Sequence, residues 1–167
     1  MFVLGVDPGV SRCGYGVVRR SPGDGIGFEA VAAGVVTTSP ADPLPERLAE
    51  LARELRALVA EVRPEAVAVE RVFFQTNART AMSVGQASGL ALVAAAEAGC
   101  EVAQYTSNEV KQAVAGYGAA TKAQVQEMVA TLCRLPGYPR PPDAADALAL
   151  AICHLTLARG RARIEAA

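Results

Sequence analysis

The sequence predicts an α/β fold with a mixed five-stranded sheet, made of an antiparallel meander plus two parallel strands and flanked by helices. Three observations predict it. Three strand-like segments joined by short turns open the chain, two further strand-like segments each follow a helical segment, and helices fill the remainder. The 167 residues are 51 % apolar and 20 % charged, which is enough for one domain with a sizeable core.

The first three strands are expected to form the meander. They are predicted over the ranges Phe2–Asp7, Gly14–Arg20 and Gly27–Thr38. The connections are short and contain Pro-Gly and Ser-Pro-Gly-Asp-Gly, both of which are turn-forming sequences. Because short turns join strands that run in opposite directions, these three strands are expected to be antiparallel.

A helix follows the meander and leads into a fourth strand. Leucine and valine recur at three- and four-residue steps between Leu48 and Val62, which predicts an amphipathic helix ending near Arg63, before Pro64. The segment A-V-A-V-E-R-V-F, which begins at Ala66, is the predicted fourth strand. A crossover helix makes this strand parallel to the first one.

The rest of the chain is expected to hold one more strand among helices. A helix rich in small residues covers Ala78–Ala98, ends at Gly99 and precedes a fifth strand over Glu101–Tyr105. Three further helices are predicted over the ranges Asn108–Ala115, Lys122–Leu135 and Asp143–Arg159.

We expect a single domain over residues 1–160 and a flexible tail over residues 161–167. No apolar run is long enough for a membrane-spanning helix, and no basic region precedes the first apolar residues, so we expect no membrane association and a cytoplasmic location. The four cysteines lie in apolar segments without metal-ligand spacing, which is typical of small buried side chains in a reducing compartment.

Two acidic residues end the first and fourth strands. Alternation along the strands places Asp7 on the same face as Gly5, and Glu70 on the same face as Ala68. The small neighbours leave room beside each acid for a helix end or an ion. If the two strands are parallel, both acids lie at the same edge, where open α/β sheets bind ligands. The alternative is that both acids simply point into water, since Asp before Pro-Gly is a common turn former.

A pair of aspartates marks the start of the last helix. Asp143 and Asp146 are three residues apart, so they share one helix face. The alternative is that Asp143 caps the helix and Asp146 only complements its dipole. The surrounding alanines predict close packing on the sheet, which would carry both aspartates toward the strand ends. The one histidine, His154, lies too far along the helix to act with them and is expected to be structural.

Four carboxylates at one place would repel one another unless cations join them. Their hard oxygen atoms favour Mg²⁺ or Mn²⁺, and two strand-end acids plus a helical pair match a two-metal site for hydrolysis. The net charge of −1 argues against a nucleic-acid partner, but with the four acids set aside the rest of the chain sums to +3. Phosphate binding would therefore depend on a local basic patch and on bound cations.

Four sequence blocks now resemble one known family. In order and spacing, these blocks are similar to the RuvC family of crossover junction endodeoxyribonucleases. They are G-V-D-P-G-V-S-R-C-G-Y-G-V-V, V-A-V-E-R-V-F-F-Q-T-N-A-R-T-A-M-S-V-G-Q-A-S-G-L-A-L, S-N-E-V-K-Q-A-V-A-G-Y-G-A-A-T-K-A-Q-V-Q-E-M-V and D-A-A-D-A-L-A-L-A-I-C-H. The resemblance covers nearly the whole chain and is weakest in the helix before Pro64 and in the tail.

The resemblance implies a ribonuclease H-like fold and a homodimer with one site in each protomer. It implies resolution of four-way (Holliday) DNA junctions in recombination and repair, by paired symmetric nicks that ligase can seal. It places the metal-binding acids of the family on Asp7, Glu70, Asp143 and Asp146, and implies two Mg²⁺ ions per site, with Mn²⁺ as a substitute. The implied partners are RuvA and RuvB, the branch-migration proteins.

One hypothesis divides the ligands between the two ions. Asp7 and Glu70 would hold the ion that activates water, while Asp7 and the helical aspartates would hold the ion that stabilises the leaving 3′-oxygen.

The resemblance also assigns residues to DNA. Phe73 matches the family aromatic and is favoured as a wedge that stacks on a junction base, although Phe74 could take this role instead. From the sequence alone, both could equally be core residues. Basic residues that match or neighbour family positions are expected to contact phosphate, although each could also be a solvated surface residue: Lys111, Lys122, Arg71 and Arg79.

Two alternatives from other classes remain open. The chain could be a non-catalytic junction-binding module of the same fold, which would bind junctions without cutting them. It could also be an actin-like nucleotide-binding domain, because D-x-G near the N-terminus begins that fold too. The single domain and the helical D-x-x-D argue against the second alternative.

Overall fold

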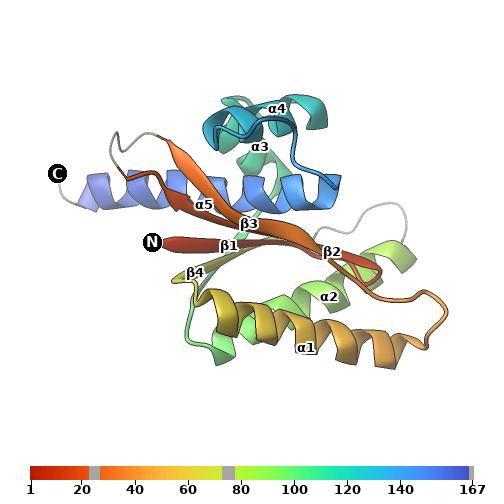
Figure 1. Cartoon of the computed structure of the whole chain (residues 1–167). Helices are drawn as coiled ribbons and strands as arrows, with labels where there is room; N and C mark the ends of the chain where they lie inside the picture. The colour runs from red at the N-terminus through yellow and green to blue at the C-terminus, as the bar shows by residue number, and fades with distance from the viewer. Residues whose placement is uncertain (23–26, 73–77, 166–167) are drawn as a thin grey trace.

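The computed structural model describes residues 1–22, 27–72 and 78–165, with side chains described from residue 81 in the third range and up to residue 158. A five-stranded sheet forms the middle layer, and helices cover both of its faces (Figure 1). The strands are β1 (Phe2–Asp7), β2 (Arg12–Arg20), β3 (Phe28–Thr37), β4 (Ala66–Glu70) and β5 (Glu101–Tyr105). The helices are α1 (Leu44–Val62), α2 (Ala78–Glu97), α3 (Ser107–Ala115), α4 (Lys122–Leu132) and α5 (Pro142–Glu165).

The sheet order is β3-β2-β1-β4-β5. β1, β2 and β3 are paired antiparallel, whereas β4 is parallel to β1 and β5 is parallel to β4. The fold-class prediction is therefore confirmed. The fourth strand ends at Glu70, so the predicted extension through Arg71 and Val72 is wrong, and Phe73 lies outside the described residues.

Two apolar cores lie on opposite faces of the sheet. Leu4 and Val6 of β1 and Val67 of β4 face α1 and α2, while Val3 and Ala68 face α3, α4 and α5. This is the alternation that the sequence predicts for both strands. The four cysteines are unpaired thiols, three of them buried.

Close contact between α5 and the sheet depends on glycine. A Cβ atom on Gly5 would overlap the carbonyl oxygen of Ala147, and one on Gly16 would lie 2.7 Å from the backbone nitrogen of Leu148. The helix contributes buried alanines to the same contact. The space beside Asp7 is thus filled by a helix, one of the two occupants expected from the sequence.

Several helix boundaries differ from the predictions. The fourth helix ends at Leu132, because Arg134 adopts a left-handed conformation with φ of 52° and Pro136 follows. The last helix begins at Pro142 and continues to Glu165, beyond its predicted end at Arg159. Helix geometry thus covers most of the segment predicted as a tail, whose flexibility stays a prediction. Within the described ranges, each helix is too short or too polar to span a bilayer.

Candidate active site

The carboxyl ends of β1 and β4 place two acids side by side. In the parallel register Val6 lies opposite Val69, so Asp7 and Glu70 are the next residues at the same edge of the sheet. Both side chains are partly buried. The expectation of a shared edge is confirmed.

The N-terminal end of α5 brings the other two acids to this edge. Gly14, which is paired with Asp7 across the sheet, has no side chain, and a Cβ atom there would overlap the carbonyl oxygen of Asp143. Because α5 begins at Pro142, Asp143 lies inside the helix and is not its N-cap. The side chains of Asp143 and Asp146 are 29 % and 28 % exposed, so neither simply points into water.

Crowding of negative charge perturbs the strand acids. The pKa of Asp7 is raised to about 7, first by burial and then by Glu70, Asp146 and Asp143. Burial and Asp146 also raise the pKa of Glu70. Lys122 opposes both shifts. The four acids therefore act on one another electrostatically as a single cluster.

A hollow of about 430 Å³ lies beside the cluster. Its lining includes Asp7, Glu70 and Asp146 together with both predicted phosphate-binding lysines, Lys111 and Lys122. Lys111 comes from α3 and Lys122 is the first residue of α4. The capping box of α4, in which Thr121 and Gln124 bond each other's backbone, fixes the start of the helix that carries Lys122.

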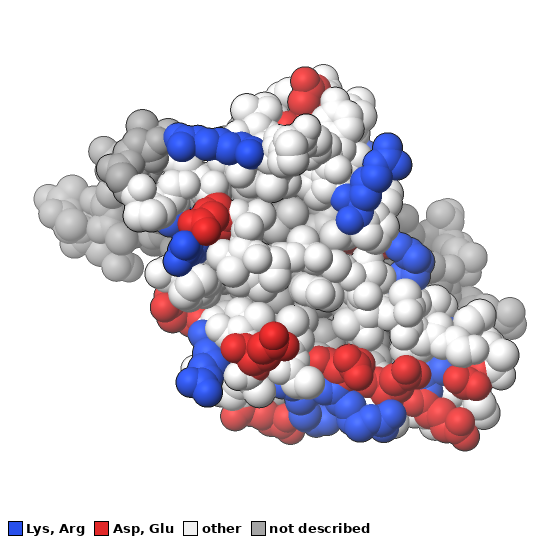
Figure 2. Space-filling view, viewed as in Figure 1, with Lys and Arg blue, Asp and Glu red and all other residues white. Residues whose placement is uncertain are grey.

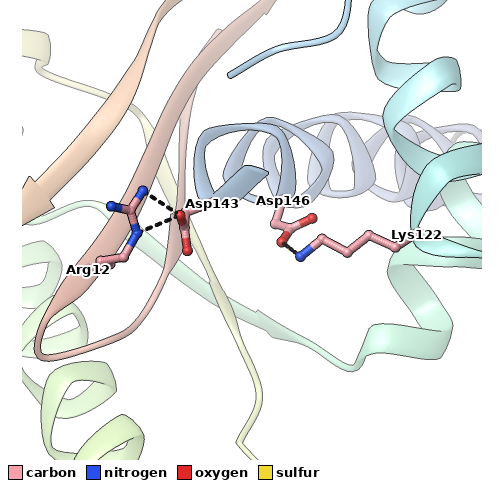
Figure 3. A network of polar contacts seen from close by, with 4 residues as sticks. All are labelled: Arg12, Lys122, Asp143 and Asp146. Carbon is pink, nitrogen blue, oxygen red and sulfur yellow. Dashed lines mark hydrogen bonds and ion pairs between the residues drawn. The ribbon is translucent and has the colours of Figure 1, made fainter. Parts of the chain in front are cut away.

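Two ion pairs hold the helical aspartates from opposite sides (Figure 3). The Lys122 ammonium donates to Asp146 Oδ2 at 2.5 Å, which raises the pKa of Lys122. Arg12, at the start of β2, donates from Nε and Nη2 to Asp143 Oδ2 at 3.0 and 2.9 Å. Within the described residues, no group of three acids, histidines or cysteines forms a ready-made metal site. Each helical aspartate is instead paired with a cationic side chain.

The donor set nevertheless fits hard divalent cations. All four side chains offer carboxylate oxygens, the ligands that Mg²⁺ and Mn²⁺ prefer. Burial first, and then the three neighbouring acids, raise the pKa of Asp7 and disfavour its charged form, which a bound cation would favour.

Of the remaining residues predicted to contact DNA, only Arg71 has a described side chain. Arg71 is exposed, its guanidinium lies 3.5 Å from the carbonyl oxygen of Gln104, and it does not line the described part of the hollow. Phe73 and Phe74 lie outside the described residues, as does the side chain of Arg79. These three assignments stay predictions.

The structure confirms one structural assignment and adds one residue. His154 is 1 % exposed and lies 2.9 Å from the Tyr105 hydroxyl within the core, in keeping with a structural role. The contact of Arg12 with Asp143 was not foreseen. Its only sequence signal is a basic residue three positions after the Pro8-Gly9 turn.

Comparison with known proteins gives consistent matches. The family described as "Crossover junction endodeoxyribonuclease RuvC" matches residues 3–154. A protein of that name from Salinispora arenicola is 56 % identical over 167 residues, covering 100 % of this chain and 94 % of the relative.

Solved structures agree with this match. Thermus thermophilus RuvC is 42 % identical, with 96 % of both chains covered, and superposes with a TM-score of 0.88 alone and 0.89 in complex with a Holliday junction substrate. The yeast mitochondrial Holliday junction resolvase Ydc2 shares the fold at 15 % identity, with a TM-score of 0.66 over 98 % of this chain and 84 % of that one.

Proposed function

The chain belongs to the RuvC family of crossover junction endodeoxyribonucleases, and we propose that it resolves four-way DNA junctions by paired, symmetric, metal-dependent nicks. One observation carries the proposal. Four carboxylates from β1, β4 and α5 gather at one sheet edge, beside a hollow lined by two lysines. Such a site suits a phosphodiester, because cations held by the acids and the lysines can together offset its charge.

We propose Asp7, Glu70, Asp143 and Asp146 as the ligands of two Mg²⁺ ions, with Mn²⁺ as a substitute. When bound, the ions supply activation of water and stabilisation of the leaving 3′-oxygen. The protein contributes the positions of its own groups. β1 and β4 fix Asp7 and Glu70 through the sheet register, and α5 holds Asp143 against Gly14.

The lysines are proposed to bind the DNA phosphate. Hydrogen bonding to Asp146 keeps Lys122 protonated, so it serves as a charged donor and not as a base. Lys111 lines the other part of the same hollow. Arg71 and Arg79, which lie near Glu70 in the sequence, are proposed to contact phosphate. One of Phe73 and Phe74 is proposed to stack on a junction base, as the family resemblance implies.

A homodimer is proposed through α2. Met82 and Val93 on this helix are 67 % and 46 % exposed, and a Cβ atom on Gly85 or Gly89 would meet nothing within 4 Å. An exposed apolar helix face with small residues permits close approach of a second copy. In contrast, α1 carries mixed charges along its exposed surface (Figure 2). One active site in each protomer would account for paired nicks.

The partners RuvA and RuvB are proposed from the family alone. The cytoplasmic location and the division into one nuclease domain over residues 1–160 and a tail over residues 161–167 are proposed from the sequence. A non-catalytic junction-binding module is the second candidate, and it is tested by the same experiment as the first.

The test uses a mobile four-way junction and a linear duplex, each incubated with Mg²⁺ and with EDTA. We expect paired nicks on the junction only, and only with Mg²⁺. Asp7→Asn should keep junction binding and lose cleavage, whereas Asp42→Asn, on the exposed loop before α1, should retain both. Binding without scission by the unmodified protein in Mg²⁺ and in Mn²⁺ would instead identify a binding module.

A further inference from the structure

A second hollow lies on the other side of Asp143 from Lys122. Its volume is about 330 Å³, and it separates the β1–β2 turn from the start of α1. Two guanidinium groups, those of Arg12 and Arg47, line it together with Gly9, Ser11 and Ser83. No Asp or Glu is among the described residues of this lining.

Arg47 fixes the turn from the side of α1. Its Nε donates to Thr38 Oγ1 at 3.0 Å, and its Nη2 donates to Ser11 Oγ at 2.5 Å. Thr38 is buried and donates in turn to the carbonyl oxygen of Val10 at 2.6 Å. The turn that carries Arg12 is therefore held by a continuous set of hydrogen bonds, which pre-organises the hollow.

Arg12 connects this hollow to the acid cluster. Its side chain is 50 % exposed, and its Nε and Nη2 both donate to a single oxygen, Asp143 Oδ2. A guanidinium has five N–H donors, so three lie outside this ion pair. If the Asp143 carboxylate binds a cation instead, more N–H donors of the Arg12 guanidinium become available to an anion.

The position of the hollow indicates which anion it would bind. Figure 3 shows Arg12 and Lys122 on opposite sides of the two helical aspartates. A DNA strand with its scissile phosphate at the acid cluster would meet the lysines on one side and the two arginines on the other. Planar guanidinium groups with nearby hydroxyls match the geometry of a phosphodiester.

We propose that Arg12, supported by Arg47 and Ser11, forms a second phosphate subsite that binds a backbone phosphate of the cleaved strand next to the scissile one. This inference rests on the proposed function. It assigns Arg12 two partners at once: Asp143 through Nε and Nη2, and DNA phosphate through the donors that lie outside this ion pair.

The test measures junction binding in EDTA, where no cleavage interferes. Each phosphate contact adds about 0.9 to the slope of log K against log salt, so Arg12→Gln should lower the slope by about 1 and weaken binding about tenfold. Methylphosphonate replacement of single phosphates beside the cleavage position should weaken binding by the unmodified protein at one position. The same replacement should have little effect on Arg12→Gln. A parallel titration with inorganic phosphate as the competitor distinguishes a general anion site from a subsite for DNA phosphate.

Two controls separate the subsite from other roles of Arg12. Arg56→Gln removes an equal charge from the exposed face of α1, where Arg56 pairs with Glu97, and should leave the slope unchanged. The double variant Arg12→Gln/Asp143→Asn restores the local net charge. If it binds as tightly as the unmodified protein, Arg12 only neutralises Asp143 and the inference fails. If the unmodified protein cleaves junctions but Arg12→Gln binds them normally, the inference fails and the proposed function stands.

Discussion

Lys122 and Asp146 form a 2.5 Å ion pair that joins the first residue of α4 to the N-terminal end of α5. The two residues are 24 positions apart, yet their contact places a fixed positive charge among four carboxylates. The same lysine lowers the pKa of Asp7 and of Glu70, against the effect of burial. The pair therefore connects the proposed phosphate-binding lysine with the charge state of the proposed metal ligands.

Replacement of Lys122 should lower the cleavage rate and should shift the loss of activity at acid pH to higher pH. In Lys122→Gln the pKa of Asp7 should rise further, because an attractive charge is lost, so the acid limb of the pH–rate profile should move to higher pH. We also expect cleavage to fall about a hundredfold or more. Single-turnover rates across a pH series measure both effects. Lys111→Gln is the matched control in the same hollow, and an identical alkaline shift there would contradict the role given to Lys122.

Asp7 should make the metal-free protein less stable as pH rises. Its pKa is raised to about 7 in the folded protein from an ordinary value of 3.8, so between these values the folded state binds more protons than the unfolded state. Folding stability from this group is therefore lost from about pH 4 to pH 7 and stays reduced above. Asp7→Asn should raise the Tm by roughly 5 °C at about pH 8 in EDTA, and by much less at about pH 4. Asp42→Asn serves as the exposed control, and an equal gain at both pH values would argue against this cause.

Divalent cations should reverse that loss. A cation that binds only the folded state at a hundred times its Kd stabilises it by about 2.7 kcal/mol. Mg²⁺ should therefore raise the Tm of the unmodified protein at pH 8, as measured by differential scanning fluorimetry. The rise should disappear in Asp7→Asn and persist in Asp42→Asn. An equal rise in both variants would place the stabilising ion elsewhere.

The contact between Gly5 and α5 should be intolerant of even one methyl group. Gly5→Ala places a Cβ atom against the carbonyl oxygen of Ala147, so α5 must move away from the sheet. We expect a loss of about 1–3 kcal/mol in the free energy of unfolding and a large loss of cleavage. Urea denaturation measures the first quantity. Gly137→Ala, where a Cβ atom meets nothing within 4 Å, is the control, and equal stability of the two variants would contradict the packing argument.

The exposed face of α2 should control assembly. Met82→Glu places a charge on the proposed dimer surface and should convert dimers into monomers, measured by analytical ultracentrifugation. Its nicks on a junction should no longer be paired. Val31→Glu changes a residue that is 48 % exposed on β3 and should leave the assembly state unchanged. A dimeric Met82→Glu would direct the search to another surface.

Sequence periodicity predicted the sheet and the four acids because both depend on local rules. Alternation fixed the faces of β1 and β4, and a three-residue spacing placed Asp143 and Asp146 together. The Arg12–Asp143 pair joins residues 131 positions apart, and no local rule encodes such a contact. Helix ends were less accurate, since the end of α4 depends on the left-handed conformation of Arg134.

The glycines beneath α5 have a consequence for how this enzyme can vary. At Gly5 and Gly14 main chain lies directly against main chain, so the spacing between Asp7 and the helical aspartates depends on peptide groups and not on adjustable side chains. Relatives adapted to heat or cold can therefore repack the apolar core under α1 and α2 without changing the geometry of the active site. Substitutions at these few glycines would be the ones that change its dimensions.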